Sequence, residues 1–313
     1  MRFINKNTLF FGLGFLSYSL TNHLSANEMS DTSSATNIKL EAIVETFGQG
    51  YSFESEQLAE KRELLIHLPK DYQGSNKQYP VLYVLDGDSH FKHAVLAANT
   101  LQQYDMMPES IVVAIPNNTG KRNRDVSTGR DKFSAFIKQE VMTYIDENYK
   151  ISGHNTLFGH SSMGFLTLDL FAKEQQLFDN YIAASPAVDQ ADTELLEKVE
   201  QLFTQNKLNN KSLYFTATDK NREIPGFTDG AINLAKLFSE KAPKDLLWRY
   251  NFIPGQQHMT TPYVTLYEGL SMVFNDYQTP VYANYNDFVQ SGAMQGFTDL
   301  YLKRGKKYNI SKE

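Results

Sequence analysis

Short runs of apolar residues alternate with longer amphipathic stretches along most of the sequence. Six apolar runs are each bounded by turn-forming residues: PVLYVLDG, SIVVAIPN, NTLFGHS, NYIAASPA, KSLYFTATD and LLWRYNFIPG. Continuous apolar runs of this length are typical of strands that are buried on both faces of a sheet. Residues 131–149, 230–242 and 261–277 instead repeat their apolar residues at helical spacing. The pattern predicts an α/β fold with a mostly parallel central sheet and helices on both faces.

The two ends of this alternating region have patterns of their own. Leu64, Ile66 and Leu68 alternate with polar or smaller neighbours, which predicts antiparallel strands at one edge of the sheet. The last segment of the chain is polar and aromatic and predicts short helices. Since 313 residues are compatible with a single large core, we expect one α/β domain over residues 37–278 and a helical C-terminal extension over residues 279–313.

The first residues predict a secretory signal peptide over residues 1–26. Arg2 and Lys6 form a positive n-region, TLFFGLGFLSYSL is the apolar segment, and Ala26 offers a small residue for cleavage. An uncleaved membrane anchor is the alternative, but this apolar segment is shorter than the ~20 residues that span a bilayer. We expect residues 27–36 to be a disordered lead-in. The mature protein is then periplasmic or secreted, with no stable membrane insertion.

The composition argues against several kinds of partner and site. The chain has 30 Lys and Arg against 36 Asp and Glu, a net charge of -6, so we expect no nucleic-acid partner. We interpret its one basic cluster, LKRGKK near the C-terminus, as a solvated helix end. Cysteine is absent, which excludes disulfides and thiolate chemistry. His90 and His93 are three residues apart without a third ligand motif, so we expect no metal and no cofactor.

The segment TLFGHSSMGFL contains two candidates for a nucleophilic serine. A nucleophile elbow, G-x-S-x-G, is a sharp strand-to-helix turn in which the residues two before and two after the serine are small. If Ser161 is the nucleophile, the misfit is Met163, a flexible side chain that can leave a tight space. If Ser162 is the nucleophile, the misfit is the rigid ring of His160. Shape therefore favours Ser161, while a serine that only caps the helix remains the structural alternative.

One of the seven histidines has the position expected of a general base. His258 follows a predicted late strand and precedes a helix, which agrees with a serine–acid–histidine order along the chain. His67 lies within a predicted strand and is interpreted as structural, and His154 lies in a turn before a predicted strand. His160 adjoins the nucleophile and is expected to point away from it.

The remaining groups of an acyl-transfer site have candidates too. Asp219, directly at the end of a predicted strand, is the first choice for the acid that orients the histidine, and Glu223 is the alternative. An oxyanion hole needs one amide from the residue after the nucleophile and one from an earlier loop. These donors would be the amides of Ser162 and of Gly87 or Asp88.

Together these segments resemble a known family. The matching text is LPKDY, YPVLYVLDGDSHF, MPESIVVAIPN, DKFSAFIKQEVMTYIDENY, LFGHSSMGFLTLDLF, LFDNYIAASPAVD, LYFTATD and FIPGQQHMTTPYVTLYEGL. It resembles the putative esterase family of α/β hydrolases, which includes esterase D, the enterobactin esterases and the mycolyltransferases, and is most similar to the exported bacterial branch. The usual elbow of such relatives, G-H-S-x-G-G, aligns with Gly159 to Gly164. The resemblance implies an α/β-hydrolase fold, Ser161 as nucleophile and a small-molecule ester as substrate.

Two features of the resemblance have more than one interpretation. Met163 stands where relatives have the second elbow glycine, and we expect its side chain to bend aside or to intrude on the oxyanion hole. The RNRD stretch matches the family's R-x-R-D. Arg122 or Arg124 could bind an anionic group of the substrate, or an arginine could pair with Asp125 and hold the loop in place.

Three hypotheses about function follow. The first is an exported serine esterase that forms an acyl-enzyme through a Ser161–His258–Asp219 triad. The second is a catalytically degenerate hydrolase fold that serves as a binding protein. The third is an acyltransferase that uses the same triad and passes the acyl group to an alcohol.

Overall fold

The apolar runs of the sequence form the strands of one mixed sheet. The computed structural model describes residues 46–189, 192–205 and 208–310, which lie in one structural unit, Glu45–Glu313. The predicted signal peptide and lead-in lie outside the described residues. Within the described part, the sheet order is β1-β2-β4-β3-β5-β6-β7-β8. The strands are β1 (Gln49–Ser55), β2 (Glu60–His67), β3 (Tyr79–Leu85), β4 (Ile111–Ile115), β5 (Ile151–His160), β6 (Asn180–Ala184), β7 (Ser212–Ala217) and β8 (Leu247–Phe252).

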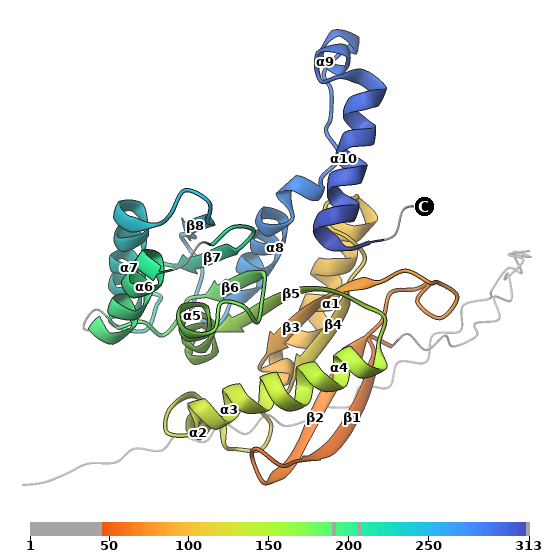
Figure 1. Ribbon diagram of the computed structural model, residues 1–313. Coiled ribbons are helices and arrows are strands. Elements are labelled where there is room, and N and C mark those ends of the chain that lie inside the picture. Colours follow the sequence, from red (N-terminus) through yellow and green to blue (C-terminus); the bar gives the residue numbers. More distant parts are fainter. Residues whose placement is uncertain (1–45, 190–191, 206–207, 311–313) are drawn as a thin grey trace, which may run out of the picture. The chain divides into compact units, whose positions relative to one another are not determined.

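Helices connect these strands and cover the sheet (Figure 1). They are α1 (Gly87–Gln103), α2 (Arg122–Val126), α3 (Arg130–Phe136), the π-helical η1 (Ile137–Met142), α4 (Thr143–Asn148), α5 (Ser162–Lys173), α6 (Thr193–Gln205), α7 (Phe227–Lys241), α8 (Thr261–Val273), the 3-10 helix η2 (Asn275–Tyr277), α9 (Tyr285–Gln290) and α10 (Ala293–Tyr308). Within the part of the chain described, no helix is both long and apolar enough to cross a membrane.

The direction of the strands agrees with the α/β-hydrolase fold expected from the sequence. The edge pairs β1–β2 and β2–β4 are antiparallel, as the alternation around Leu64 predicts, and the pairs from β4 through to β8 are parallel. The parallel strands therefore end at one edge of the sheet, where loops that follow different strands meet. This edge, at the carboxyl ends of the strands, carries the candidate active site.

Successive side chains of β3 enter two different cores. Val81, Tyr83 and Leu85 belong to the core beneath α3, α5, α6 and α7, whereas Leu82 and Val84 belong to the core beneath α1 and α8. Figure 1 shows α4 and α5 in front of the strands and α1 behind them. Because both faces are covered, the strand is apolar throughout, which explains the continuous apolar run in its sequence.

The C-terminal extension consists of α9 and α10. The last turn of α10 packs on the body, where Tyr308 is fully buried and its ring contacts Phe274. The rest of the extension projects away from the sheet (Figure 1). Rings of Tyr282, Phe288 and Phe297 pack against one another in its outer part. The extension thus has a small aromatic cluster of its own.

Candidate active site

The turn between β5 and α5 has the geometry of a nucleophile elbow. Ser161 has a φ of 59°, a value that L-residues rarely adopt. Its amide donates to the carbonyl of Ala184 at 3.0 Å, and its carbonyl accepts from the amide of Ala187 at 2.9 Å. Ser161 stands at the N-cap of α5, but its side chain makes no capping hydrogen bond. The hydroxyl is therefore available for another partner, contrary to the cap-only interpretation.

Only a glycine fits two residues before this serine. A Cβ atom added to Gly159 would lie 2.3 Å from the carbonyl oxygen of Met163. The close approach of strand and helix is thus made by the backbone of Met163, while its side chain is fully buried in the core. Of the two positions expected for this side chain, the structure shows the first: it lies aside from the close approach, in the core. Gly164 makes the next close approach, 3.1 Å from the carbonyl oxygen of Ala184 for an added Cβ.

His258 lies in the loop between β8 and α8, as the sequence predicts. Its Nε2 atom is 3.0 Å from the Oγ atom of Ser161. The backbone of His258 is held on both sides: its amide donates to the carbonyl of Arg222 at 3.0 Å, and its carbonyl accepts from the Thr261 hydroxyl at 2.9 Å. The imidazole is therefore held against the hydroxyl that it would deprotonate.

The carboxylate that contacts this imidazole belongs to Glu223. Its Oε1 atom forms a short hydrogen bond with Nδ1 of His258 and also accepts from the amide of Ile224 at 2.9 Å. The side chain of Glu223 is fully buried. A buried carboxylate at Nδ1 favours the tautomer whose Nε2 can accept a proton from serine, and it stabilises the imidazolium that then forms.

Asp219, the first choice from the sequence, lies elsewhere. Its carboxylate accepts from the amide of Gly255 at 2.6 Å, so it joins the loop after β7 to the loop that carries His258. The chain turns back after Asp219, with the amide of Arg222 donating to the carbonyl of Asp219 at 2.8 Å. This turn brings Glu223 to the imidazole instead. Of the two candidate acids, the structure thus brings Glu223, and not Asp219, into contact with the imidazole.

A buried histidine lies behind His258. Nε2 of His160 is 3.0 Å from the carbonyl oxygen of His258, and the two ring centroids are 4.6 Å apart. Burial lowers the pKa of His160 to about 3, so the ring is neutral at ordinary pH. It must then donate its Nε2 proton to this carbonyl. The sequence predicted only that His160 points away from the serine. It did not indicate the hydrogen bond between His160 and the backbone of His258.

The other two histidines of this region, His90 and His93, contact each other. Nδ1 of His90 is 3.0 Å from Nε2 of His93, and the ring of His90 also packs on that of His160. Burial lowers the pKa of His90, and it lowers that of His93 to about 4. Across the described residues, no three His, Asp or Glu side chains are grouped as metal ligands.

His154 lies within β5, not in a turn before it, and is buried beside Asn180.

The loop after β3 lies next to the elbow. β3 pairs with β5 in parallel, with Val84 opposite Phe158, so Gly87 and Ser161 follow neighbouring strand ends. Gly87 and Ser162 are the first residues of α1 and α5. The first amides of a helix have no intrahelical acceptor, so they can bind an anion. A Cβ atom on Gly87 would lie 2.8 Å from the Cβ of Ala114, which shows how tightly this loop is packed.

The two arginines of the RNRD stretch pair with carboxylates of the protein itself. Arg122 forms a forked pair with Asp86, the residue before α1, with distances of 2.8 to 3.0 Å. Arg124 donates to Glu60 at 2.8 and 3.0 Å and to Asp125 at 2.5 and 2.8 Å. These contacts favour the structural interpretation of both arginines. Arg122 in particular holds the loop that leads into Gly87.

The sequence of this chain is similar to those of known proteins. A family model described as "Putative esterase" matches residues 55–273 of the chain. The uncharacterized protein YjcH of Bacillus subtilis is 28% identical over 218 residues, which cover 66% of this chain and 88% of that protein. The ferri-bacillibactin esterase BesA of the same organism is 25% identical over 164 residues, which cover 43% of this chain and 57% of that esterase.

A solved structure has the same fold. The IroE-like serine hydrolase from Shewanella oneidensis superposes with a TM-score of 0.70 at 24% identity, covering 84% of this chain and 88% of that one. At this level of identity the likeness concerns the arrangement of strands and helices.

Proposed function

Because the chain belongs to the putative esterase family of α/β hydrolases, we propose that it is a serine esterase that cleaves carboxylic esters through an acyl-enzyme. The observation that carries the proposal is the contact of 3.0 Å between Oγ of Ser161 and Nε2 of His258, with Glu223 on the far side of the imidazole. The acid of the proposed triad is Glu223 in place of Asp219.

In the proposed mechanism, His258 acts first as base and then as acid. Its Nε2 accepts the Ser161 proton while Oγ attacks the ester carbonyl carbon, and it returns that proton to the departing alcohol oxygen. Water then attacks the acyl-enzyme by the same steps and releases the acid. Glu223 remains ionised and stabilises the imidazolium at each tetrahedral intermediate.

The proposed oxyanion hole consists of backbone amides at the starts of two helices. The amide of Ser162 begins α5, and the amide of Gly87 or Asp88 begins α1. Both lie next to the strand ends that β3–β5 pairing brings together. Amides fixed in this way need no rearrangement when charge develops on the carbonyl oxygen.

We propose a small-molecule ester with an apolar group as substrate. Ile224, Met259 and Tyr263 adjoin the site in sequence and are 40%, 66% and 54% exposed. Exposed apolar side chains beside a reactive centre suit an apolar acyl or aryl group. Since one relative is a ferri-bacillibactin esterase, siderophore esters belong in the first substrate panel, beside p-nitrophenyl esters of increasing acyl length.

The proposal is tested with p-nitrophenyl acetate. Ser161→Ala should abolish hydrolysis, whereas Ser162→Ala should only weaken it, because alanine retains the backbone amide. Equal residual activity in the two variants would refute the assignment. Products formed with added alcohols separate an acyltransferase from a hydrolase.

We also propose that the protein is exported. The proposal rests on the charged, apolar and small-residue pattern of residues 1–26. It is tested by N-terminal sequencing of the protein recovered from its native host. A mature chain that begins near residue 27 supports export, and a chain that retains Arg2 and Lys6 contradicts it.

A further inference from the structure

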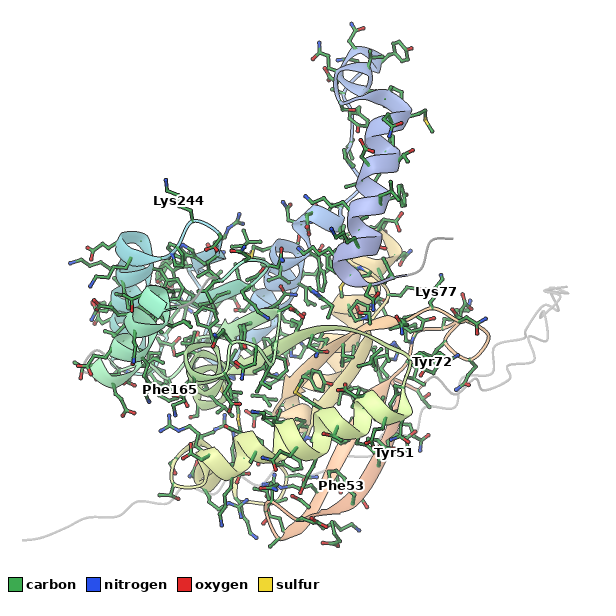
Figure 2. All side chains as sticks on the ribbon, in the orientation of Figure 1. Tyr51, Phe53, Tyr72, Lys77, Phe165 and Lys244 are labelled. Atoms are coloured by element: carbon green, nitrogen blue, oxygen red, sulfur yellow. The ribbon has the colours of Figure 1, made fainter. Side chains whose placement is uncertain are left out.

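A cavity of about 800 Å³ lies between α10 and the opposite edge of the sheet. Gln78 and Tyr79, at the start of β3, line one side, and α10 lines the other. Figure 2 shows Lys77, a further lining residue, just below the base of α10. The volume is within the range of about 300–1,000 Å³ that is usual for small-molecule sites. Most of the wall is apolar: Pro108, Tyr277, Met294, Phe297, Tyr301 and Leu302.

The wall also contains one buried cation. Arg304 is only 4% exposed. Its guanidinium carbon lies 4.7 Å from the ring centre of Tyr277 and 5.1 Å from that of Tyr301. One nitrogen donates to the Thr279 hydroxyl at 3.3 Å, while Nε has no hydrogen-bond partner within the described residues. Burying the charge of a guanidinium is costly, so the cation as a whole calls for an anionic partner.

The carboxylates around the cavity are engaged by other groups. Glu109, which lines it, lies 3.6 Å from Nζ of Lys77. Asp276 accepts from Lys307 at 2.8 Å and from the hydroxyl of Tyr308. In the part of the chain that the structure describes, no carboxylate forms an ion pair with Arg304. The two tyrosine rings near its guanidinium offset only part of the desolvation of its charge.

We propose that this cavity binds a hydrophobic carboxylate. The carboxylate pairs with the part of the Arg304 guanidinium that lines the cavity, and the apolar body of the ligand lies against the aromatic and aliphatic wall. Arginine suits this role because its planar fork matches a carboxylate and it stays charged. A small polar anion such as phosphate would leave the apolar wall in contact with water. Glu109 at the wall disfavours a ligand with a second negative charge.

This site is separate from the proposed esterase site. Tyr79 pairs with Ile151 at the amino ends of β3 and β5, whereas Ser161 follows the carboxyl end of β5. Ten residues of β5 separate the two ends, which places the sites roughly 30 Å apart at about 3.3 Å per residue. The inference therefore does not depend on the proposed function.

The experiment is calorimetric titration of the full chain with dodecanoate below its micelle concentration, with dodecanol as the neutral control. We expect saturable binding of one dodecanoate. Arg304→Met should weaken it by about 10-fold or more, since hydrogen bonds to charged groups are the strong ones, and should leave dodecanol binding unchanged. Arg304→Met should also keep the ester hydrolysis rate of the wild type.

A second pair of variants keeps the proposal testable if Arg304→Met prevents α10 from docking. Met294 lines the cavity and is 70% exposed, so its replacement should not disturb folding. Met294→Glu should weaken dodecanoate binding because its negative charge repels the carboxylate. Met294→Lys is the matched control: it also introduces a charge, but a positive one, and should not weaken binding. Equal affinities for dodecanoate and dodecanol would overturn the proposal. A second result would also overturn it: the wild-type protein does not bind dodecanoate and forms a dimer that Met294→Glu dissociates. In that case a second copy of the chain, and not a carboxylate, would cover the cavity.

Discussion

Two residues at opposite ends of the parallel strands, His258 and Arg304, differ in how their polar atoms are paired. At the carboxyl ends, His258 has a partner for each ring nitrogen and for its backbone amide and carbonyl. At the amino ends, Arg304 is more deeply buried than His258, lines an apolar cavity and forms no ion pair with a carboxylate of the described residues. The imidazole of His258, with a partner at each nitrogen, is placed to act within the molecule. A buried cation that has no counter-charge beside an apolar cavity suits an anionic partner from outside.

The difference in pairing between His258 and Arg304 follows from the segments that cover the two ends of the strands. Side chains join the loops after β5, β7 and β8: the Thr218 Oγ1 atom lies 2.9 and 3.0 Å from the carbonyl oxygens of Ile253 and Gln256, and His258 contacts both Ser161 and Glu223. Such ties fix the reacting groups before substrate arrives. The amino ends are instead covered by the extension, of which only the last turn of α10 packs closely. A cavity remains beneath its outer turns.

The largest effect is expected at the acid of the proposed triad. Glu223→Gln should lower kcat by roughly 10⁴-fold, as expected when the wrong imidazole tautomer is favoured. Asp219→Asn keeps a hydrogen-bond acceptor for the Gly255 amide and should lower kcat only slightly. Steady-state hydrolysis of p-nitrophenyl acetate by the two variants measures both effects. If Asp219→Asn proved the more damaging, the acid would have to be reassigned.

A core residue of the elbow should affect stability more than a cavity residue does. Met163→Ala removes a fully buried side chain and should lower the free energy of unfolding by about 2–5 kcal/mol. Met294→Ala, at an exposed position of the cavity wall, should change it by no more than about 0.5 kcal/mol. Urea denaturation of both variants provides the measurement. Similar values would mean that Met163 is not packed as described.

Both ends of the strands should lose stability in acid. Burial lowers the pKa of His154 to about 4 and that of His160 to about 3. At His154, Lys211 and Lys307 lower the pKa further, while Asp179 and Asp276 oppose the shift. The unfolded chain, with histidine pKa values of about 6.5, binds more protons than the folded one below that pH. The contribution of these neutral histidines to the free energy of unfolding is therefore fully present above about pH 6.5, and it is lost as the pH falls toward 4.

Thermal unfolding between pH 7.5 and 4.5 measures this loss. We expect Tm to fall steadily over the lower part of the range. His154→Asn, which removes one of the titrating groups, should reduce the slope. A Tm that stays constant down to pH 5 would contradict neutral, buried histidines at both ends.

The smallest effect is expected behind the base. His160→Phe keeps a ring but loses the hydrogen bond to the carbonyl of His258, and it should lower kcat by up to about 10-fold with little change in KM. His160→Gln has an amide that can replace the Nε2 donor and should recover most of the rate. If the glutamine variant were no better than the phenylalanine variant, the hydrogen bond would not position His258.

Some parts of the site were predictable because they depend on local pattern. Ser161 follows from a glycine two residues earlier between strand and helix, and His258 from its loop after the last strand. The choice between Asp219 and Glu223 was not predictable, because it depends on a turn that is held by contacts with a distant loop. The spacing of residues along the chain does not indicate which contacts the turn makes with that loop.

The same limit applies to packing around the fold. The basic segment LKRGKK was interpreted as a solvated helix end, yet Arg304 within it is buried. Tyr277 and Tyr301 cover it, and Tyr277 lies in η2, outside that helix. Met163 was judged as an obstacle because the elbow pattern calls for a small residue there. In the fold the tight contact involves the backbone, so the side chain is free to join the core.

The most direct test of the esterase account is the site of modification by a fluorophosphonate, which reacts with activated serines. The account predicts a single adduct on the peptide that contains Ser161, absent in Ser161→Ala and formed far more slowly in Glu223→Gln. An adduct on Ser162 in the wild-type protein, or no adduct in a folded sample, would contradict it.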